Sequence, residues 1–231
     1  MKVNYKICLA IVILGILTLN AFAQDELWQT LNAEILKLSQ KGKYYDAVLV
    51  ARNAVKFSEK NYGPNHPKLA TSMNSLATLY RIIGRYDDAE MYYRQALIIR
   101  NTALGGHHPS VATSLNNLAG LYRAQGRYAE AEPLYLKALR IRQNALSSNH
   151  PDLGQSLNNL GLLYKNQSRY AEAEQFYKKA LAIWEQTLGP NNPNVATVLE
   201  NMAELYKKTD RKDEANALLA RAQKIRTIAG K

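Results

Sequence analysis

Apolar residues along the chain recur at spacings of three and four, the pattern of amphipathic helices. One such stripe consists of Val111, Ala112, Leu115, Leu118, Ala119 and Tyr122, and a second consists of Ala131, Leu134, Tyr135, Ala138, Leu139 and Ile141. Gly126 lies between the two stripes and can adopt the positive φ that ends a helix. The pattern therefore predicts a hairpin of two helices.

The same two-helix unit recurs with a period of 42 residues. Three kinds of position keep this spacing: Pro67, Pro109, Pro151 and Pro193; Arg85, Arg127, Arg169 and Arg211; and Ala47, Ala89, Ala131, Ala173 and Ala215. A fixed long period is typical of stacked repeats. We predict an all-α fold, a solenoid of antiparallel helix pairs, with five repeats at about 26–67, 68–109, 110–151, 152–193 and 194–228.

Part of the third unit resembles the tetratricopeptide repeat. The matching residues are Leu118, Ala119, Tyr122, Gly126, Tyr128, Ala131, Tyr135 and Ala138. That repeat usually has about 34 residues, whereas the unit here has 42. The string from Leu115 to Glu132 is similar to the kinesin light chain variety of the repeat. The resemblance covers residues 28–226 and implies a right-handed superhelix whose first helices line the concave side. The end copies depart from the pattern, as expected where a stack faces water.

First-helix positions outside the core stripe form two polar rows. The asparagine row contains Asn74, Asn116 and Asn158 at one place and Asn117, Asn159 and Asn201 at the next; the cationic row contains Arg81, Arg123, Lys165 and Lys207. Asparagine can pair with a peptide backbone, and cations attract carboxylates. The resemblance implies a similar use of this face, so we expect a peptide-binding groove for an extended, acidic segment. Two alternatives remain: the asparagines could bond neighbouring helices, and the cations could form a solvated face.

The N-terminus has the layout of a secretory signal peptide. Lys2 and Lys6 precede an apolar run over residues 7–19, and Ala21-Phe22-Ala23 follows. This predicts a signal peptide over 1–23 and a repeat domain over 24–231, exported to the periplasm or secreted. The run is shorter than the roughly 20 residues that span a bilayer, although an uncleaved membrane anchor is the alternative. Cleavage would remove Cys8, the sole cysteine, and leave 28 basic and 19 acidic residues, a net charge of +9.

No catalytic motif is found in the sequence. A phosphate-binding glycine loop, His-Glu-x-x-His and Gly-x-Ser-x-Gly are all missing. His66, His108 and His150 each precede a proline, a setting typical of a helix start. We therefore expect no enzyme activity, cofactor or metal. The net charge of +11 permits nucleic-acid binding, but basic and acidic residues alternate and the chain carries an export signal, so we expect no nucleic-acid partner.

These observations predict an exported scaffold or adaptor that holds a peptide or protein segment, with a second class of function as the alternative. In that alternative the chain is a structural assembly element, which self-associates or joins an envelope complex through its repeat ends or convex face. Leu218, Leu219 and Ile225 on the last helix are expected to be partly exposed, which would leave room for a homodimer contact.

Overall fold

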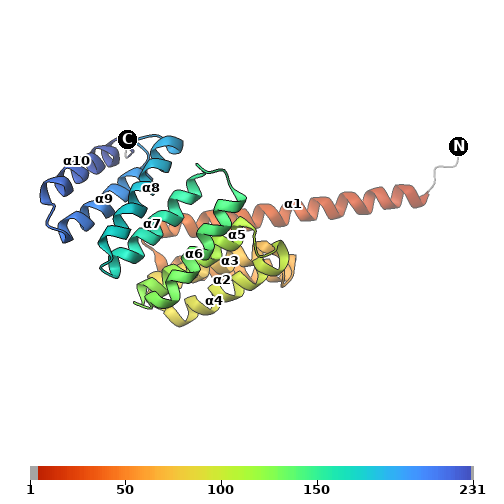
Figure 1. Cartoon of the computed structure of the whole chain (residues 1–231). Helices are drawn as coiled ribbons and strands as arrows, with labels where there is room; N and C mark the ends of the chain where they lie inside the picture. The colour runs from red at the N-terminus through yellow and green to blue at the C-terminus, as the bar shows by residue number, and fades with distance from the viewer. Residues whose placement is uncertain (1–4, 230–231) are drawn as a thin grey trace. The chain divides into compact units, whose positions relative to one another are not determined.

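The computed structural model describes the backbone of residues 5–229 and the side chains of residues 22–229. All regular secondary structure in that range is helical (Figure 1). The helices are α1 (Tyr5–Gln40), α2 (Tyr44–Tyr62), α3 (Pro67–Ile82), α4 (Tyr86–Leu104), α5 (Pro109–Ala124), α6 (Tyr128–Ala145), α7 (Pro151–Asn166), α8 (Tyr170–Leu188), α9 (Pro193–Lys208) and α10 (Lys212–Ala229). Most of the predicted signal peptide, Cys8 included, lies outside the described side chains.

The helices form two compact units, Met1–Ala103 and Leu104–Lys231. In unit 1, α1 packs on α2 and α2 on α3, while α3 and α4 are joined by Thr78 and Tyr93, whose hydroxyls lie 2.9 Å apart. In unit 2, the pairs α5–α6, α7–α8 and α9–α10 are linked by α6–α7 and α8–α9 contacts. The predicted all-α fold of consecutive helix pairs is confirmed.

Each first helix from α3 onward begins at a proline preceded by a capping side chain. Because the proline lacks an N–H at a position that needs none, it suits the first turn. The capping residues are His66, His108, His150 and Asn192, and each accepts a hydrogen bond from the backbone N–H two residues later, at 3.1, 3.1, 3.2 and 2.9 Å. The histidines of the His-Pro pairs thus have a structural role at the helix start.

The arginine that recurs every 42 residues connects the two helices of a repeat. Gly126 has a φ of 74° after α5, and Arg127 then donates to Glu130 in the first turn of α6 at 2.7 Å. The same guanidinium lies 4.0 Å from the ring centroid of Tyr122 on α5. In the next repeat Arg169 repeats these contacts and also donates to Glu132 at 3.1 Å, so it joins successive repeats as well.

The core between paired helices is built from small and large residues that complement one another. The positions 28, 70, 112 and 154 on first helices are Trp28, Ala70, Ala112 and Gly154, and the facing second-helix positions are Ser58, Arg100, Arg142 and Trp184. Trp28 donates to Ser72 at 3.0 Å, and Trp184 donates to the Pro151 carbonyl at 3.0 Å. The two tryptophans of the chain are therefore contributed from opposite helices of their repeats.

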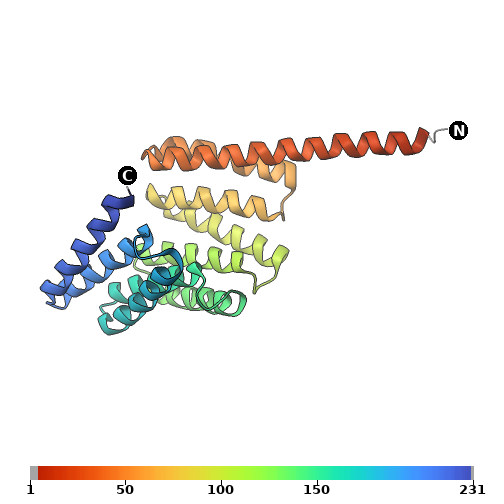
Figure 2. The same cartoon turned by 90° about the horizontal axis from the view of Figure 1, so that it is seen from above.

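The ends of the chain differ from the inner repeats. Helix α1 has 36 residues, whereas α3 has 16, and Figure 2 shows α1 extending beyond α2 at its N-terminal side. No helix in the described part of the chain is both long and apolar enough to span a membrane. At the other end, the expectation that Ile225 is partly exposed is wrong: its side chain is 2% exposed because it packs in the α9–α10 pair. Leu218 and Leu219 are half-buried as expected.

Candidate functional site

The first helices of unit 2 form a common face. Helix α5 contacts α7, and α7 contacts α9, so side chains of these three helices that avoid the core lie on one side of the unit. We call this surface the first-helix face; it includes the predicted residues Asn117, Arg123, Asn159, Lys165, Asn201 and Lys207. The predicted residues Asn74 and Arg81 lie on α3 in unit 1.

One part of the predicted asparagine row is buried. Asn74, Asn116 and Asn158 are only 6%, 6% and 4% exposed. The Asn116 amide donates to Ser156 Oγ of α7 at 3.2 Å, and Asn158 Oδ1 accepts from Asn201 of α9 at 2.9 Å. Asn116 and Asn158 therefore bond a neighbouring first helix, the alternative left open by the sequence, and burial removes all three from the accessible surface. Asn117 and Asn159 are half-buried and reach the face.

The members of the cationic row differ in whether a neighbouring side chain or water can satisfy their charged groups. Lys165 is 14% exposed and forms an ion pair with Glu204 of α9. Arg81 interacts with the Tyr93 hydroxyl in unit 1, and Lys207 is exposed. Arg123 differs, because its Nε is buried and has no hydrogen-bond partner among the described residues. Arg123 and Lys165 are at equivalent positions of successive repeats. The position of Glu204, the ion-pair partner of Lys165, corresponds to Leu162 one repeat earlier. Because leucine has no charge, it cannot form the same ion pair with Arg123.

Tyr177 has another of the buried polar atoms that lack a partner among the described residues. The Tyr177 side chain of α8 is 0% exposed, and its hydroxyl has no partner within the described residues. Burial raises the pKa of Tyr177, while the charge of Arg123 lowers it and that of Glu204 raises it. Tyr177 is therefore electrostatically coupled to both charged groups. Tyr177 has the spacing of a core position and no polar signal of its own, so the sequence does not predict it as a site residue.

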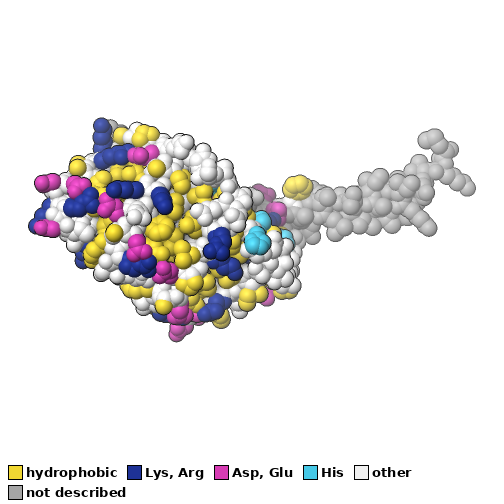
Figure 3. All heavy atoms as spheres, viewed as in Figure 1, with side chains coloured by type: hydrophobic (Ala, Val, Ile, Leu, Met, Phe, Trp, Pro, Cys, Tyr) yellow, Lys and Arg dark blue, Asp and Glu magenta, His cyan; other side chains and the backbone are white. Residues whose placement is uncertain are grey.

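The surface also carries charged side chains of both signs and side chains of metal-ligating types. On the face drawn in Figure 3, Lys and Arg side chains are interspersed with Asp and Glu, so the positive net charge is not gathered into one patch there. Among the described residues, no group of three His, Cys, Asp or Glu side chains could hold a metal ion.

Comparison with known proteins agrees with this architecture. The tetratricopeptide repeat model matches residues 30–102, 76–144, 110–186 and 152–228. The chain belongs to the tetratricopeptide repeat family. A comparison with curated proteins gives no match. Because tetratricopeptide repeat proteins generally act as protein-interaction scaffolds and are typically non-catalytic, a protein or peptide is the expected type of partner.

Solved structures show similar repeats. Kinesin light chain nearly identical TPR-like repeats of Podosopora anserina are 25% identical, with a TM-score of 0.66, covering 87% of this chain and 95% of that one. BtubC (BKLC) from P. vanneervenii is 26% identical, with a TM-score of 0.69, covering 87% and 80%. A Rap protein complexed with competence and sporulation factor is 20% identical, with a TM-score of 0.72, covering 83% and 52%, and shows the fold alone.

Proposed function

We propose that this tetratricopeptide repeat protein is an exported, non-enzymatic scaffold that holds an extended acidic peptide segment on the first-helix face of unit 2. Among the described residues four buried side-chain atoms lack a hydrogen-bond partner, namely Asn116 Oδ1, Arg123 Nε, Arg142 Nε and Tyr177 Oη. The observation that carries the proposal is that Arg123, at the first-helix face, and Tyr177, which its charge affects, are both among them. A buried polar group without a partner costs about 1–3 kcal/mol. Such atoms in a native structure call for a water or a ligand to bond them.

A carboxylate fits this position. It accepts hydrogen bonds from both the guanidinium and the phenol, and charge-assisted bonds of this kind are stronger than neutral ones. Asn117 and Asn159 lie at equivalent positions of adjacent first helices, and their side chains can bond the backbone of the same segment. The proposed ligand is thus an extended peptide with an acidic side chain or a terminal carboxylate placed at Arg123.

A pull-down with residues 24–231, followed by titration calorimetry with the recovered partner, tests this proposal. The triple variant Asn117→Ala, Arg123→Ala and Asn159→Ala is expected to weaken binding at least about 10-fold, since 1.4 kcal/mol corresponds to a factor of ten. Raising the salt concentration should weaken binding by the wild type more than binding by the variant, because the lost contact is ionic. The exposed Arg140 on α6 supplies the matched control, and Arg140→Ala should bind as the wild type does.

Retention of the partner by the triple variant would reject the first-helix face. The self-association alternative would then be favoured if light scattering finds an oligomer. Its candidate surface is in the first repeat, where Leu36, Tyr45 and Leu49 are 59%, 74% and 60% exposed. The double variant Leu36→Glu and Leu49→Glu would dissociate an oligomer formed through this surface.

The period of the repeats supports export with cleavage after Ala23. The other first helices begin at Pro67, Pro109, Pro151 and Pro193, and the corresponding residue of the first repeat is Asp25. Asp25 accepts a hydrogen bond from the Tyr62 hydroxyl at 2.8 Å and pairs with Lys68. The bonds from Lys68 and Tyr62 hold the pKa of this carboxyl below its usual value. Cleavage would therefore remove the extra part of α1 and keep the residues that belong to the repeat.

Expression of the full chain in a secreting host should give a product with the mass of residues 24–231 in the periplasm or medium. Ala23→Arg, which places a large charged residue at the cleavage site, should yield an uncleaved, membrane-associated chain. A wild-type product of full length in the cytosol contradicts the export proposal. A full-length product in the membrane fraction favours the anchor alternative.

A further inference from the structure

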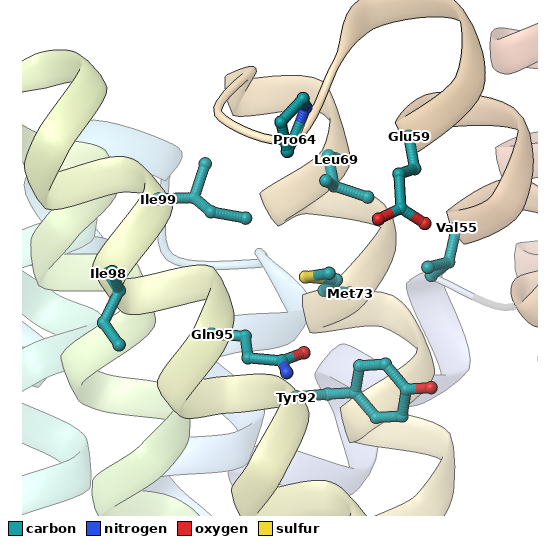
Figure 4. A pocket seen from close by; sticks show the side chains of 9 residues that line it. All are labelled: Val55, Glu59, Pro64, Leu69, Met73, Tyr92, Gln95, Ile98 and Ile99. Carbon is teal, nitrogen blue, oxygen red and sulfur yellow. The ribbon is translucent and has the colours of Figure 1, made fainter.

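A pocket lies in unit 1 between α2, α3 and α4. Its volume is about 350 Å³, within the range of ligand-binding clefts. Val55, Leu69, Met73 and Ile99 supply apolar walls. Figure 4 shows the Glu59 carboxylate and the Gln95 amide extending from α2 and α4 toward the space between the helices. The pocket therefore combines an aliphatic lining with an acidic rim.

The repeat architecture builds the same pocket again in unit 2. A hollow of about 520 Å³ there is lined by residues that include Leu139, Leu153, Leu157 and Ile183. These residues stand 84 positions after Val55, Leu69, Met73 and Ile99. The equivalent of Glu59 is Gln143, and the equivalent of Gln95 is Lys179. The apolar lining is thus common to both pockets, whereas the charge at the rim is particular to each.

The α8–α10 contact shows which side chain can pair with an acidic residue at the position of Glu59. Glu185 on α8 is the equivalent of Glu59, and Arg221 on α10 is the equivalent of Gln95. Arg221 donates to Glu185 at 2.5 Å, so one helix supplies the cation for the other. Between α2 and α4 the same place is occupied by the uncharged Gln95, which cannot neutralise Glu59.

We propose that the α2–α4 pocket receives an arginine side chain from an amphipathic helix of a partner protein. The aliphatic stem of that arginine lies against Leu69, Met73 and Ile99, and its guanidinium pairs with Glu59 as Arg221 does with Glu185. Arginine stems pack on apolar surface while the head keeps its charge partner. A helix is a suitable carrier because it bonds its own backbone groups and presents the arginine beside apolar side chains on one face.

The neighbouring hollow adds a second requirement on the partner. Arg52 and Lys56 of α2 line a space of about 380 Å³ that adjoins the pocket and shares Val55, Glu59 and Tyr92 with it. Arg52 and Glu59 are seven residues apart on one helix, which is about two turns. A partner helix lying along α2 should therefore carry an acidic residue about two turns from its arginine, with an apolar residue between them.

A synthetic amphipathic helix with one arginine, a leucine one turn later and a glutamate two turns later is the test probe. Titrated into the full chain labelled at methyl groups, it should shift the Met73 and Ile99 methyl signals. The same peptide with glutamine in place of arginine should bind about 10-fold more weakly, equivalent to about 1.4 kcal/mol. Glu59→Arg should weaken binding of the arginine peptide and strengthen binding of a peptide that has glutamate in place of the arginine.

Gln95→Arg recreates the Glu185–Arg221 pair and should abolish peptide binding while circular dichroism stays unchanged. Lys179→Arg introduces arginine at the equivalent position of unit 2 and should bind like the wild type. Equal binding of the arginine and glutamine peptides, unshifted Met73 and Ile99 methyls, or full binding by Gln95→Arg would each overturn the proposal. Arg123→Ala should leave this binding unchanged, so failure here is distinct from failure at the first-helix face.

Discussion

Arg142→Ala is expected to lower the free energy of unfolding by about 3 kcal/mol, the loss typical of a truncated buried side chain with polar partners. Arg142 is 4% exposed, and burial lowers the pKa of its guanidinium. It donates to the Asp152 carbonyl at 2.8 Å and to Ser156 Oγ at 2.9 Å, both on α7, and to Thr113 Oγ1 of α5 at 3.3 Å. Truncation would leave a cavity and three acceptors without this donor.

Urea titration followed by circular dichroism and tryptophan fluorescence measures this loss. Arg142→Met keeps most of the side-chain volume and should lose less than Arg142→Ala, because it avoids the cavity while removing the hydrogen bonds. Arg140→Ala, two residues earlier on the exposed side of α6, should stay within about 0.5 kcal/mol of the wild type. Equal stabilities for Arg142→Ala and Arg140→Ala would show that the buried arginine does not hold α5, α6 and α7 together.

Gly154→Ala is expected to destabilise unit 2 by about 2 kcal/mol, although the same change in an unobstructed helix stabilises by up to about 1 kcal/mol. The reason is the close approach of Trp184, which fills the space beside Gly154. A Cβ at residue 154 would lie 2.6 Å from Trp184 Nε1 and 2.8 Å from its Cε2. Trp184 is 3% exposed, so its indole has little room to move.

Gly120→Ala is the matched control for this change. Gly120 also lies within a helix, but a Cβ there would meet the Tyr135 hydroxyl at 3.4 Å, an ordinary contact. It should be neutral or stabilising in the same urea titration. Residues 154, 184 and 198 are equivalent to Ala112, Arg142 and Ser156 of the preceding repeat interface. A triple variant with Gly154→Ala, Trp184→Arg and Val198→Ser has the residues of that interface and should therefore recover stability. A Gly154→Ala protein more stable than the wild type would contradict the packing argument.

Equivalent positions of the repeat can have different roles, and the binding proposals depend on those differences. Lys165 has Glu204 as its counterion, while Arg123, one repeat earlier, has an unpartnered buried Nε. Glu185 has Arg221, whereas Glu59 has the uncharged Gln95 at the corresponding place. In both cases one repeat shows which chemical group satisfies the position, and we propose that a partner supplies this group in the other repeat.

The sequence by itself determined the class of fold and the organisation of the chain. A 42-residue period fixed the number and order of helix pairs, because a helical stripe and its turn residues are local signals. Proline at the start of α3, α5, α7 and α9 and glycine at position 126 likewise act through their own backbone preferences. The recurring asparagines and cations could also be assigned to the first helices, since spacing alone decides which face of a helix they share.

Only the tertiary structure decided which of those polar residues are accessible. Asn116 and Asn117 are adjacent in sequence and equally polar, yet Asn116 is 6% exposed and bonded to α7, while Asn117 reaches the surface. The tertiary structure also explains why Gly154 accompanies Trp184, and why Glu59 borders a pocket. Burial, counterions and steric fit depend on contacts between residues about 30 to 40 positions apart, and the pattern within one repeat carries no information about such contacts.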